Sequence, residues 1–502
     1  MLISDDSRLS FEKGSPGRRG IRLNAAPLGA KGLRDRLPAH LLRKRPLVLP
    51  EMSELEVVRH FVNLSRKNFS IDTHFYPLGS CTMKYNPKVN EWAAAHPAFT
   101  QVHPFEGDDA AQGILQVYYE TEQYLKAVSG MDRFTLQPSA GAHGELTGMM
   151  LVHAWHESRG DSRRRKILVP DSSHGTNPAS AALFNYHVVE LKSNARGRVD
   201  LDELRAHLDD ETACLMLTNP NTLGLFEEDI LEITKLVHEK GALLYYDGAN
   251  LNALLGLARP GDMGFDIVHI NLHKTFSTPH GGGGPGSGPV GVKKFLEPFL
   301  PRPLAAKTGD RYHWVTDPGQ SIGRLRAFYG NSGIILRAWV YIRMMGGPGL
   351  LRASQDAVLN ANYLRAKLKN IFQVAIDEPC MHEFVLTIRG AKKQGIHAGD
   401  IGKRLLDFGI HAPTVHFPLV VEEALMIEPT ETEAKEVLDH FVKVMGQIGE
   451  EMIRDPDLIL QAPHHLPIHR PDEVLAARKP VLSYRDLLRE KMLAAEGAPV
   501  SP

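Results

Sequence analysis

The amine of Lys274 is the side chain from which the chemistry of this sequence can be argued. The run before it, from Asp266 to Ile270, is short, apolar and rich in β-branched residues, as is typical of a buried strand. In open α/β sheets, ligands bind in the crevice beyond the strand ends. Partial desolvation there lowers the pKa of an amine and makes it a usable nucleophile. Because a single lysine at a strand end is more often an ordinary surface residue, the interpretation depends on its neighbours.

Other polar side chains and one small-residue turn follow predicted strands in the same way. Residues 111–330 alternate between helix-like and strand-like segments, which predicts a largely parallel sheet. The carboxyl ends of parallel strands meet at one edge of such a sheet. Besides Lys274, the residues expected at that edge are Gly141, Ala142, His143, His174, Asn221 and Asp247. We therefore predict that they form one site.

The turn from Pro138 to Glu145 leads into a helix-like stretch. A turn of this kind leaves several backbone N–H groups unpaired and pointing outward, which makes an anion site. An ordinary tight loop is the equal alternative for this segment taken alone.

The glycine run after Lys274 has the spacing of a dinucleotide fingerprint at Gly281, Gly283 and Gly286. The context of that fingerprint is missing, because prolines flank the match and a strand-like segment follows where a helix is required. The run is predicted as a loop in which the backbone approaches another group closely.

An activated lysine, an acid on a neighbouring strand end, a histidine and an anion site together suit pyridoxal 5'-phosphate as the cofactor. Its aldehyde forms a Schiff base with a lysine, here Lys274, and its ring accepts electrons. Asp247 is the candidate for holding a proton on the ring nitrogen, since a close opposite charge shifts a pKa by about 1–3 units. His174 is the candidate for lying flat against the ring.

Composition limits the classes of function and of location. The 58 Lys and Arg residues balance the 59 Asp and Glu residues, so nucleic acid and anionic membranes are not indicated as partners. Cys81, Cys214 and Cys380 show neither metal-type spacing nor a disulfide framework, which suits a reducing compartment. With no signal-type apolar segment at the start, we expect a soluble cytoplasmic protein.

At 502 residues the chain is long enough for two or three domains. We predict an N-terminal arm and structured loop over residues 1–110, a large cofactor-binding domain over 111–335, and a small C-terminal domain with an extended tail over 336–502. The loop part, residues 72–87, is rich in turn-forming and aromatic residues, and in it Cys81 and Lys84 carry no reactive signature. His464, His465 and His469 lie among prolines in the tail, a spacing that favours an extended terminus, and no metal site is predicted.

Several stretches resemble a known family. The segments around Asp247 and Lys274, with the turn at Gly141, resemble fold-type I pyridoxal phosphate enzymes of the cysteine desulfurase kind. A closer similarity is to glycine decarboxylase, the P-protein of the glycine cleavage system, and within it to the lysine-bearing second subunit of the two-subunit forms. This similarity extends over nearly the whole chain from about residue 50. The motifs that carry it are His74–Pro87, Gln137–Glu145, Asp171–Ser180, Thr218–Glu227, Asn271–Gly288, Ser321–Asn331 and Met426–Glu431.

The resemblance implies a fold and a set of residue roles. The fold is α/β, with a mostly parallel sheet in the large domain and a smaller α+β C-terminal domain. Lys274 matches the lysine that binds the cofactor, Asp247 the partner of the ring nitrogen and His174 the residue stacked on the ring. The remaining matches are cofactor contacts: Gly141, Ala142, His143 and His273 around the phosphate, Asn221 at the ring hydroxyl and Asn250 at the phosphate.

The resemblance also implies a reaction. Glycine would lose CO2, and its aminomethyl group would pass to the lipoyl group of the H-protein, which makes the enzyme an oxidoreductase of glycine catabolism. The implied partners are the first P-protein subunit, with two copies of each subunit in a heterotetramer, and the lipoylated H-protein. Another lyase or transaminase of the same fold is the main alternative, and a non-catalytic scaffold subunit is the alternative from a different class.

Overall fold

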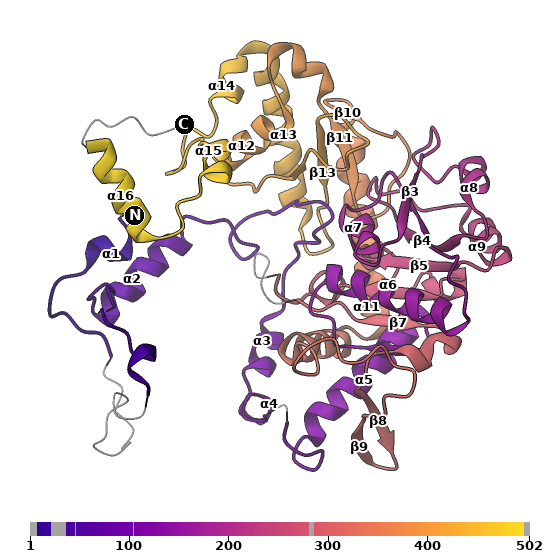
Figure 1. Cartoon of the computed structure of the whole chain (residues 1–502). Coiled ribbons are helices and arrows are strands. Elements are labelled where there is room, and N and C mark those ends of the chain that lie inside the picture. The colour runs from indigo at the N-terminus through magenta and orange to yellow at the C-terminus, as the bar shows by residue number, and fades with distance from the viewer. Residues whose placement is uncertain (1–7, 22–36, 46, 104, 281–285, 496–502) are drawn as a thin grey trace. The chain divides into compact units, whose positions relative to one another are not determined.

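The computed structural model describes residues 8–21, 37–45, 47–103, 105–280 and 286–495. The chain forms two compact units, which are described separately (Figure 1). The main unit is Ile71–Ala462, and the terminal unit combines Met1–Ser70 with Pro463–Pro502. The predicted division at residues 110 and 335 stays a prediction.

A seven-stranded sheet forms the centre of the main unit, with the strand order β1-β7-β6-β5-β4-β2-β3. Neighbours from β3 to β6 pair in parallel, and β7 is antiparallel to both β1 and β6. The predicted α/β fold with a mostly parallel sheet is therefore confirmed. The strands are β1 (Arg133–Thr135), β2 (Lys166–Pro170), β3 (His187–Leu191), β4 (Thr212–Thr218), β5 (Leu243–Gly248), β6 (Ile267–Ile270) and β7 (Val290–Val292).

The central strands are continuous apolar runs because helices cover both faces of the sheet. Strand β5 illustrates this, since successive side chains point to opposite faces. Leu244 and Tyr246 belong to a core that includes α5 (Gln112–Ser129), α9 (Ile230–Glu239) and the first part of α11 (Ser332–Leu368). Tyr245 faces the other core, with α6 (Gly141–Ser158). Here α6 comes so near that a Cβ on Gly148 would lie 2.2 Å from the Tyr245 ring.

A second sheet of four antiparallel strands lies in the C-terminal part of the main unit, in the order β10-β11-β13-β12. One face of it packs in a core with α12 (Ala398–Asp407), α13 (Lys435–Arg454) and the end of α11, which is interrupted by non-helical backbone at Gly346. This arrangement agrees with the predicted smaller α+β part. The strands are β10 (Gln373–Val374), β11 (Phe384–Thr387), β12 (Thr414–Val415) and β13 (Ala424–Ile427).

The remaining elements of the main unit complete these layers. Residues 72–87 contain no helix or regular strand, as the sequence predicted. Strands β8 (Leu304–Thr308) and β9 (Arg311–Val315) form a separate hairpin. The other helices are α3 (Lys88–Ala94), α4 (Pro97–Thr100), α7 (Thr176–Ala182), α8 (Leu201–His207), α10 (Leu272–Thr275), α12 (Ala398–Asp407), α13 (Lys435–Arg454) and α14 (Pro456–Leu460), with 3-10 turns η3 (Leu251–Ala253), η4 (Pro260–Met263), η5 (Lys294–Phe299) and η6 (Arg389–Gln394).

The terminal unit joins the two ends of the chain. The Phe11 and Tyr484 rings stack at 4.7 Å, and Lys491 Nζ lies 2.8 Å from Glu12 Oε1. The tail, predicted as extended, contains two helices, over Glu473–Arg478 and Tyr484–Ala495. The elements are α1 (Ser10–Lys13), η2 (Ala39–Leu41), α2 (Glu54–Ser65), α15 (Glu473–Arg478) and α16 (Tyr484–Ala495). In the part of the chain that the structure describes, every helix is too short or too polar to span a bilayer.

Candidate functional site

Lys274 lies in α10, a single helical turn that directly follows the buried strand β6. Its side chain is half-buried, and its charge acts on a group of ionisable side chains that come from distant parts of the chain. This group contains the predicted residues Asp247, His174 and His273 together with residues that were not singled out from the sequence. The groups influenced by the Lys274 charge are Cys81, Glu145, His174, Asp247, His269, His273, His280, His382, Glu383 and Glu428.

Asp247 ends β5, the strand next to β6, and is buried. Its Oδ2 accepts a hydrogen bond of 3.1 Å from Asn177 Nδ2, and its Oδ1 accepts one of 3.0 Å from the Ala249 N–H. Burial alone would raise the pKa of this carboxyl, but His269, these donors and Lys274 outweigh it and lower the pKa. A buried carboxylate that stays ionised can hold a proton on a nearby ring nitrogen.

His269 supports Asp247 from the neighbouring strand. Its Nε2 lies 3.3 Å from Asp247 Oδ1, and its Nδ1 lies 2.6 Å from the Tyr245 hydroxyl. Burial raises the pKa of Tyr245 and lowers that of His269, so a phenol and a neutral imidazole share this hydrogen bond, while Nε2 has no hydrogen-bond partner among the described residues. The sequence analysis missed His269, although a polar residue inside an otherwise apolar strand was a usable signal.

The predicted anion site lies at the N-terminus of α6. The N–H groups of the first three helical residues, Gly141, Ala142 and His143, have no acceptor inside the helix, since the first N–H with one is that of Gly144. No described side chain caps this end. Gly141 packs so tightly that a Cβ would lie 2.6 Å from Asn271 Oδ1, an oxygen that has no hydrogen-bond partner among the described residues. Three N–H groups and the positive end of an 18-residue helix therefore face one point.

Two histidines add donors near this anion site. His143 Nδ1 accepts from the Ser139 N–H at 3.2 Å, and His273 Nδ1 accepts from the Ser287 N–H at 3.3 Å. Burial, with the charges of His280 and Lys274, lowers the pKa of His273 to about 3. Each ring therefore keeps Nε2–H as a donor while neutral. Gly286, beside His273, is described, whereas the run 281–285 lies outside the described residues.

His174 follows β2 and is exposed, with its ring edge-on to Phe417 at 5.6 Å. Its Nδ1 lies 2.8 Å from Thr176 Oγ1, and that hydroxyl donates to Glu145 Oε1 at 2.9 Å. Although the residue is exposed, the protein atoms around its ring partly desolvate it and so lower the pKa of His174, with Asp247 opposing and Lys274 adding to the effect. The histidine predicted to lie on the ring is thus connected to a carboxyl on α6.

Glu145 is a second residue that the sequence analysis did not single out. Its carboxyl oxygens lie within 4.8 Å of ligand atoms of Asp247 and His269. Burial, together with the Asp247 charge, raises its pKa to about 8, so at neutral pH the pair carries a single negative charge. Its place four residues after Gly141, on the same face of the helix, was the available signal.

Asn221 and Asn250 are buried at the carboxyl edge of the sheet. Asn221 Nδ2 donates to the Gly197 carbonyl at 2.8 Å, and its Oδ1 accepts from two N–H groups of its own loop. Asn250 Nδ2 donates to the Pro220 carbonyl at 2.9 Å, while its Oδ1 has no partner within the described chain. Both amides hold loops of the site, and their direct contacts to a cofactor stay predictions.

Lys84 anchors the turn that carries Lys274. Its fully buried Nζ donates to the Thr275 carbonyl at 3.0 Å and to Glu431 Oε1 at 2.7 Å. Burial alone would lower the pKa of Lys84, but Glu431 outweighs it and raises the pKa. The ion pair therefore joins the 72–87 loop, α10 and the segment after β13.

We expect Lys84→Met to lower the free energy of unfolding by about 1–3 kcal/mol, because Glu431 and the Thr275 carbonyl lose a charged donor. Chemical denaturation of the purified chain measures this change. Lys88→Met is the matched control, since its pair with Asp72 (2.7 Å) is half-exposed and should contribute at most about 1 kcal/mol. Equal stability of the two variants would contradict the anchoring role.

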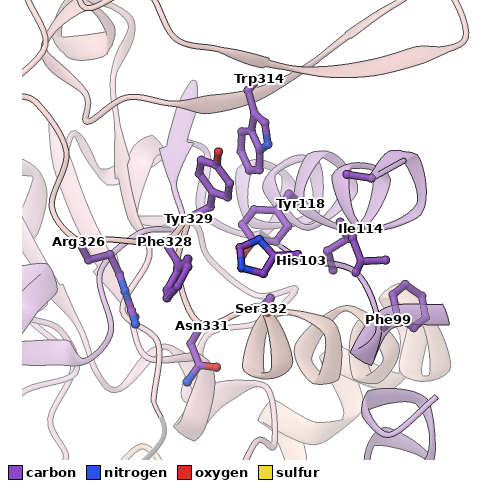
Figure 2. A pocket seen from close by; sticks show the side chains of 13 residues that line it. Phe99, His103, Ile114, Tyr118, Trp314, Arg326, Phe328, Tyr329, Asn331 and Ser332 are labelled. Carbon is purple, nitrogen blue, oxygen red and sulfur yellow. The ribbon is translucent and has the colours of Figure 1, made fainter. Parts of the chain in front are cut away.

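A cavity of about 280 Å³ lies beside the anion site. Figure 2 shows its aromatic walls, with Arg326 and Asn331 at one end and Phe99 at the other. Asn331 Nδ2 donates to the Gly286 carbonyl at 3.2 Å. Burial lowers the pKa of His143, and the positive charge of Arg326 lowers it further. Arg326 therefore adds positive charge near the N-terminus of α6, a contribution that the sequence analysis missed.

These residues fit a phosphorylated pyridine aldehyde. An uncapped helix end with neutral histidine donors suits a phosphate, and an ionised buried aspartate suits a protonated ring nitrogen. The Lys274 charge acts on both Asp247 and His273. Polar atoms around Lys274 that lack a partner in the described part of the chain include Glu145 Oε2, Asn271 Oδ1, Thr275 Oγ1 and Ser277 Oγ. Buried polar atoms without partners are uncommon, so this group indicates that a ligand belongs here.

Comparisons with known proteins identify the relatives of the chain. Residues 353–459 match the family model described as glycine dehydrogenase, C-terminal domain, and residues 147–284 match that of class-V aminotransferases. The chain is 56% identical over 483 residues to the probable glycine dehydrogenase (decarboxylating) subunit 2 of Caldanaerobacter subterraneus subsp. tengcongensis, covering 96% of this chain and 100% of the relative. It is 54% identical to the protein of the same name from Staphylococcus epidermidis, covering 98% of each.

Solved structures share the fold. A glycine decarboxylase (P-protein) of the glycine cleavage system, in inhibitor-bound form, superposes with a TM-score of 0.72 at 22% identity, covering 83% of this chain and 95% of that one. A cysteine desulfurase from Thermococcus onnurineus superposes with a TM-score of 0.58 at 15% identity, covering 75% of this chain and 95% of that one.

Proposed function

The chain belongs to the family of glycine dehydrogenase (decarboxylating) subunit 2, and we propose that it decarboxylates glycine with pyridoxal phosphate and passes the aminomethyl group to the lipoyl group of a carrier, the H-protein. The observation that carries this proposal is the placement of Lys274 beside an ionised, buried Asp247 and next to an uncapped helix end. When bound, pyridoxal phosphate would supply an aldehyde for the substrate amine and a ring that accepts the electron pair that departing CO2 leaves on the α-carbon.

Different residues of this chain would bind the phosphate, hold the ring proton and bind the aldehyde. The α6 N-terminus, with His143 and His273, would bind the phosphate and so fix the position of the ring. Asp247, oriented by Asn177 and His269, would hold the proton on the ring nitrogen. The amine of Lys274 would hold the aldehyde until glycine replaces it, and would then be free to move protons at the substrate.

A cysteine desulfurase activity is the alternative within the fold. It would require a reactive thiol, but burial raises the pKa of Cys380 to about 12 and also raises that of Cys81. A thiol with a raised pKa is a poor nucleophile near neutral pH. These surroundings favour glycine decarboxylation over desulfuration.

We also propose that this chain acts with a first subunit and a lipoylated carrier, in keeping with the name "subunit 2" of its relatives. The test is release of labelled CO2 from carboxyl-labelled glycine, with the first subunit and the carrier left out in turn. We expect the isolated chain to bind pyridoxal phosphate, seen as a visible absorption band, but to release little CO2 until both components are present. Full activity of the chain alone would contradict the two-subunit proposal.

A further inference from the structure

A pair of buried glutamates, Glu383 and Glu428, lies within the influence of the Lys274 charge and has no place in the scheme above. Strands β11 and β13 are antiparallel, with Phe384 opposite Ile427, so Glu383 and Glu428 follow as the next facing pair. Both side chains are fully buried, and ligand atoms of the two lie within 4.8 Å of each other and of His382. Two like charges directly opposite each other destabilise a strand pair, so the two carboxyls cannot both ionise without cost.

The pair faces the loop that contains Cys81. Glu383 Oε2 accepts from the Ser80 N–H at 2.6 Å, and Glu428 Oε2 accepts from the Thr82 N–H at 2.9 Å. Ser80 and Thr82 both have left-handed backbone, with φ of 60° and 49°. The loop is thus held in a strained conformation with its two N–H groups directed at the two carboxyls, a kind of strain that gathers at functional sites.

The hydrogen bonds show which oxygen is left for a proton. Glu428 Oε1 accepts from Asn252 Nδ2 at 3.3 Å, so three of the four carboxyl oxygens have N–H donors. The fourth, Glu383 Oε1, has no hydrogen-bond partner in the described part of the chain, and His382 Nε2 is 3.7 Å away. A neutral Glu383 would therefore carry its proton on a buried oxygen that lacks an acceptor.

The surrounding charges favour this protonated state. Burial and the facing Glu428 raise the pKa of Glu383, while the Ser80 N–H and Lys274 oppose the rise. Burial raises the pKa of Glu428 to about 7 against the Thr82 donor and Lys274, and Glu431, paired with Lys84, adds to the rise. At neutral pH the pair therefore retains at least one proton.

The histidines and the thiol around Lys274 are weaker proton donors at neutral pH. Burial lowers the pKa of His382 to about 3 and that of His280 to about 4, so both rings are neutral. Burial raises the pKa of the Cys81 thiol. Apart from the Lys274 amine and Glu145, whose carboxyl lies with Asp247 and His269, the Glu383–Glu428 pair holds the proton that these groups can give.

We propose that Glu383 is the general acid for the disulfide step, giving its proton to the sulfur that leaves when the lipoyl ring opens. The inference rests on the proposed function. The substrate amine takes the place of the Lys274 amine, so the α-carbon and the sulfur that it attacks must come close to that point.

The electron pair left on the α-carbon by departing CO2 forms a carbon–sulfur bond with one sulfur of the disulfide. The sulfur–sulfur bond breaks, and its pair leaves on the second sulfur, which takes the proton of Glu383 and becomes a thiol. The disulfide is reduced and the glycine carbon oxidised by two electrons. Glu383, now a carboxylate, regains a proton from water after the product leaves.

The test varies the need for a proton at the leaving sulfur. The reconstituted enzyme, containing this chain, the first subunit and cofactor, receives either lipoamide, whose alkyl thiolate needs a proton, or bis(2-pyridyl) disulfide, whose acidic aromatic thiol leaves without one. We expect Glu383→Gln to lower the rate of CO2 release with lipoamide by about 100-fold or more, the range for a general acid. With the pyridyl disulfide its rate should stay close to that of the wild type.

Glu227→Gln is the matched control. Glu227 is also buried, and burial raises its pKa. One of its carboxyl oxygens accepts from the Val199 N–H at 2.9 Å, and the other has no partner among the described atoms. Its pKa is influenced by Arg198 and Asp229 and not by Lys274. This control should match the wild type with both acceptors. Equal losses for Glu383→Gln with both acceptors, or no loss with either, would overturn the assignment.

A second measurement needs no variant and covers the case in which Glu383→Gln does not fold. For the wild type, the rate with lipoamide should fall as pH rises through the pKa of Glu383, which burial and the facing Glu428 raise above its ordinary value, and the rate with pyridyl disulfide should not show this fall. The same pH profile with both acceptors would overturn the assignment. If the wild type released no CO2 with lipoamide or lipoylated carrier, the proposed function itself would be wrong.

Discussion

Replacing Lys274 with alanine will lower the rate of glycine decarboxylation by about 100- to 10,000-fold, the range expected when a positioned proton-transfer group is removed. The loss follows from the position of α10, which directs one amine from the end of β6 toward Asp247. No other described lysine among the neighbours of Asp247 can replace it. The measurement is CO2 release by the complete system at saturating glycine.

Two further experiments separate the role of the amine from that of the positive charge. Lys274→Arg keeps the charge that acts on the surrounding acids but has no amine for the aldehyde, so we expect the same loss of rate as for alanine. Borohydride treatment of the wild type should fix the cofactor to the peptide that contains Lys274, and neither variant should be labelled. A label on another peptide would show that the assignment of the lysine is wrong.

Replacing Asp247 with asparagine will lower the rate of decarboxylation by roughly 10- to 1000-fold, or about 1.4–4 kcal/mol of transition-state stabilisation. The neutral amide keeps the shape of the carboxylate and the bond from Asn177, but it cannot hold the proton on a ring nitrogen. It also removes the negative charge that lies 3.3 Å from His269 Nε2. Steady-state rates and the absorption of the bound cofactor measure both consequences.

The spectrum provides the control for Asp247→Asn. The variant should still bind the cofactor through Lys274 and the α6 N-terminus, so its visible band should remain while its pH dependence changes. Asp266→Asn is a matched substitution on the strand next to β5, where a buried carboxylate accepts from the Leu244 N–H at 2.8 Å away from the site. Near-normal turnover of Asp247→Asn would contradict the role of the carboxylate at the ring.

The sequence by itself determined the central strands and the residues at their carboxyl ends. Strands β2, β4, β5 and β6 are short apolar runs that end in polar or small residues, and each was predicted within a few positions. The reason is physical: a strand buried on both faces needs an uninterrupted apolar run, and this pattern is local in the chain. Once the sheet was predicted to be parallel, Asp247 and Lys274 had to lie at the same edge.

Pairings between distant segments were decided only by the tertiary structure. His269 supports Asp247 because the register of β5 and β6 places the two residues opposite each other, and no local pattern encodes a register. Lys84 gave no sign of a role in the sequence, since its partner Glu431 is 347 residues away.

The buried glutamate pair shows the same limit most directly. In the sequence, Glu383 and Glu428 are ordinary acidic residues at the ends of two apolar runs. The antiparallel pairing of β11 and β13 sets them face to face, and the folding of residues 78–82 against those strands removes water from both. Desolvation then raises the pKa of each carboxyl, and repulsion by Glu428 adds to the rise at Glu383. Both effects depend on distances between segments far apart in the chain, so the proton held at this site is a property of the fold and not of either residue alone.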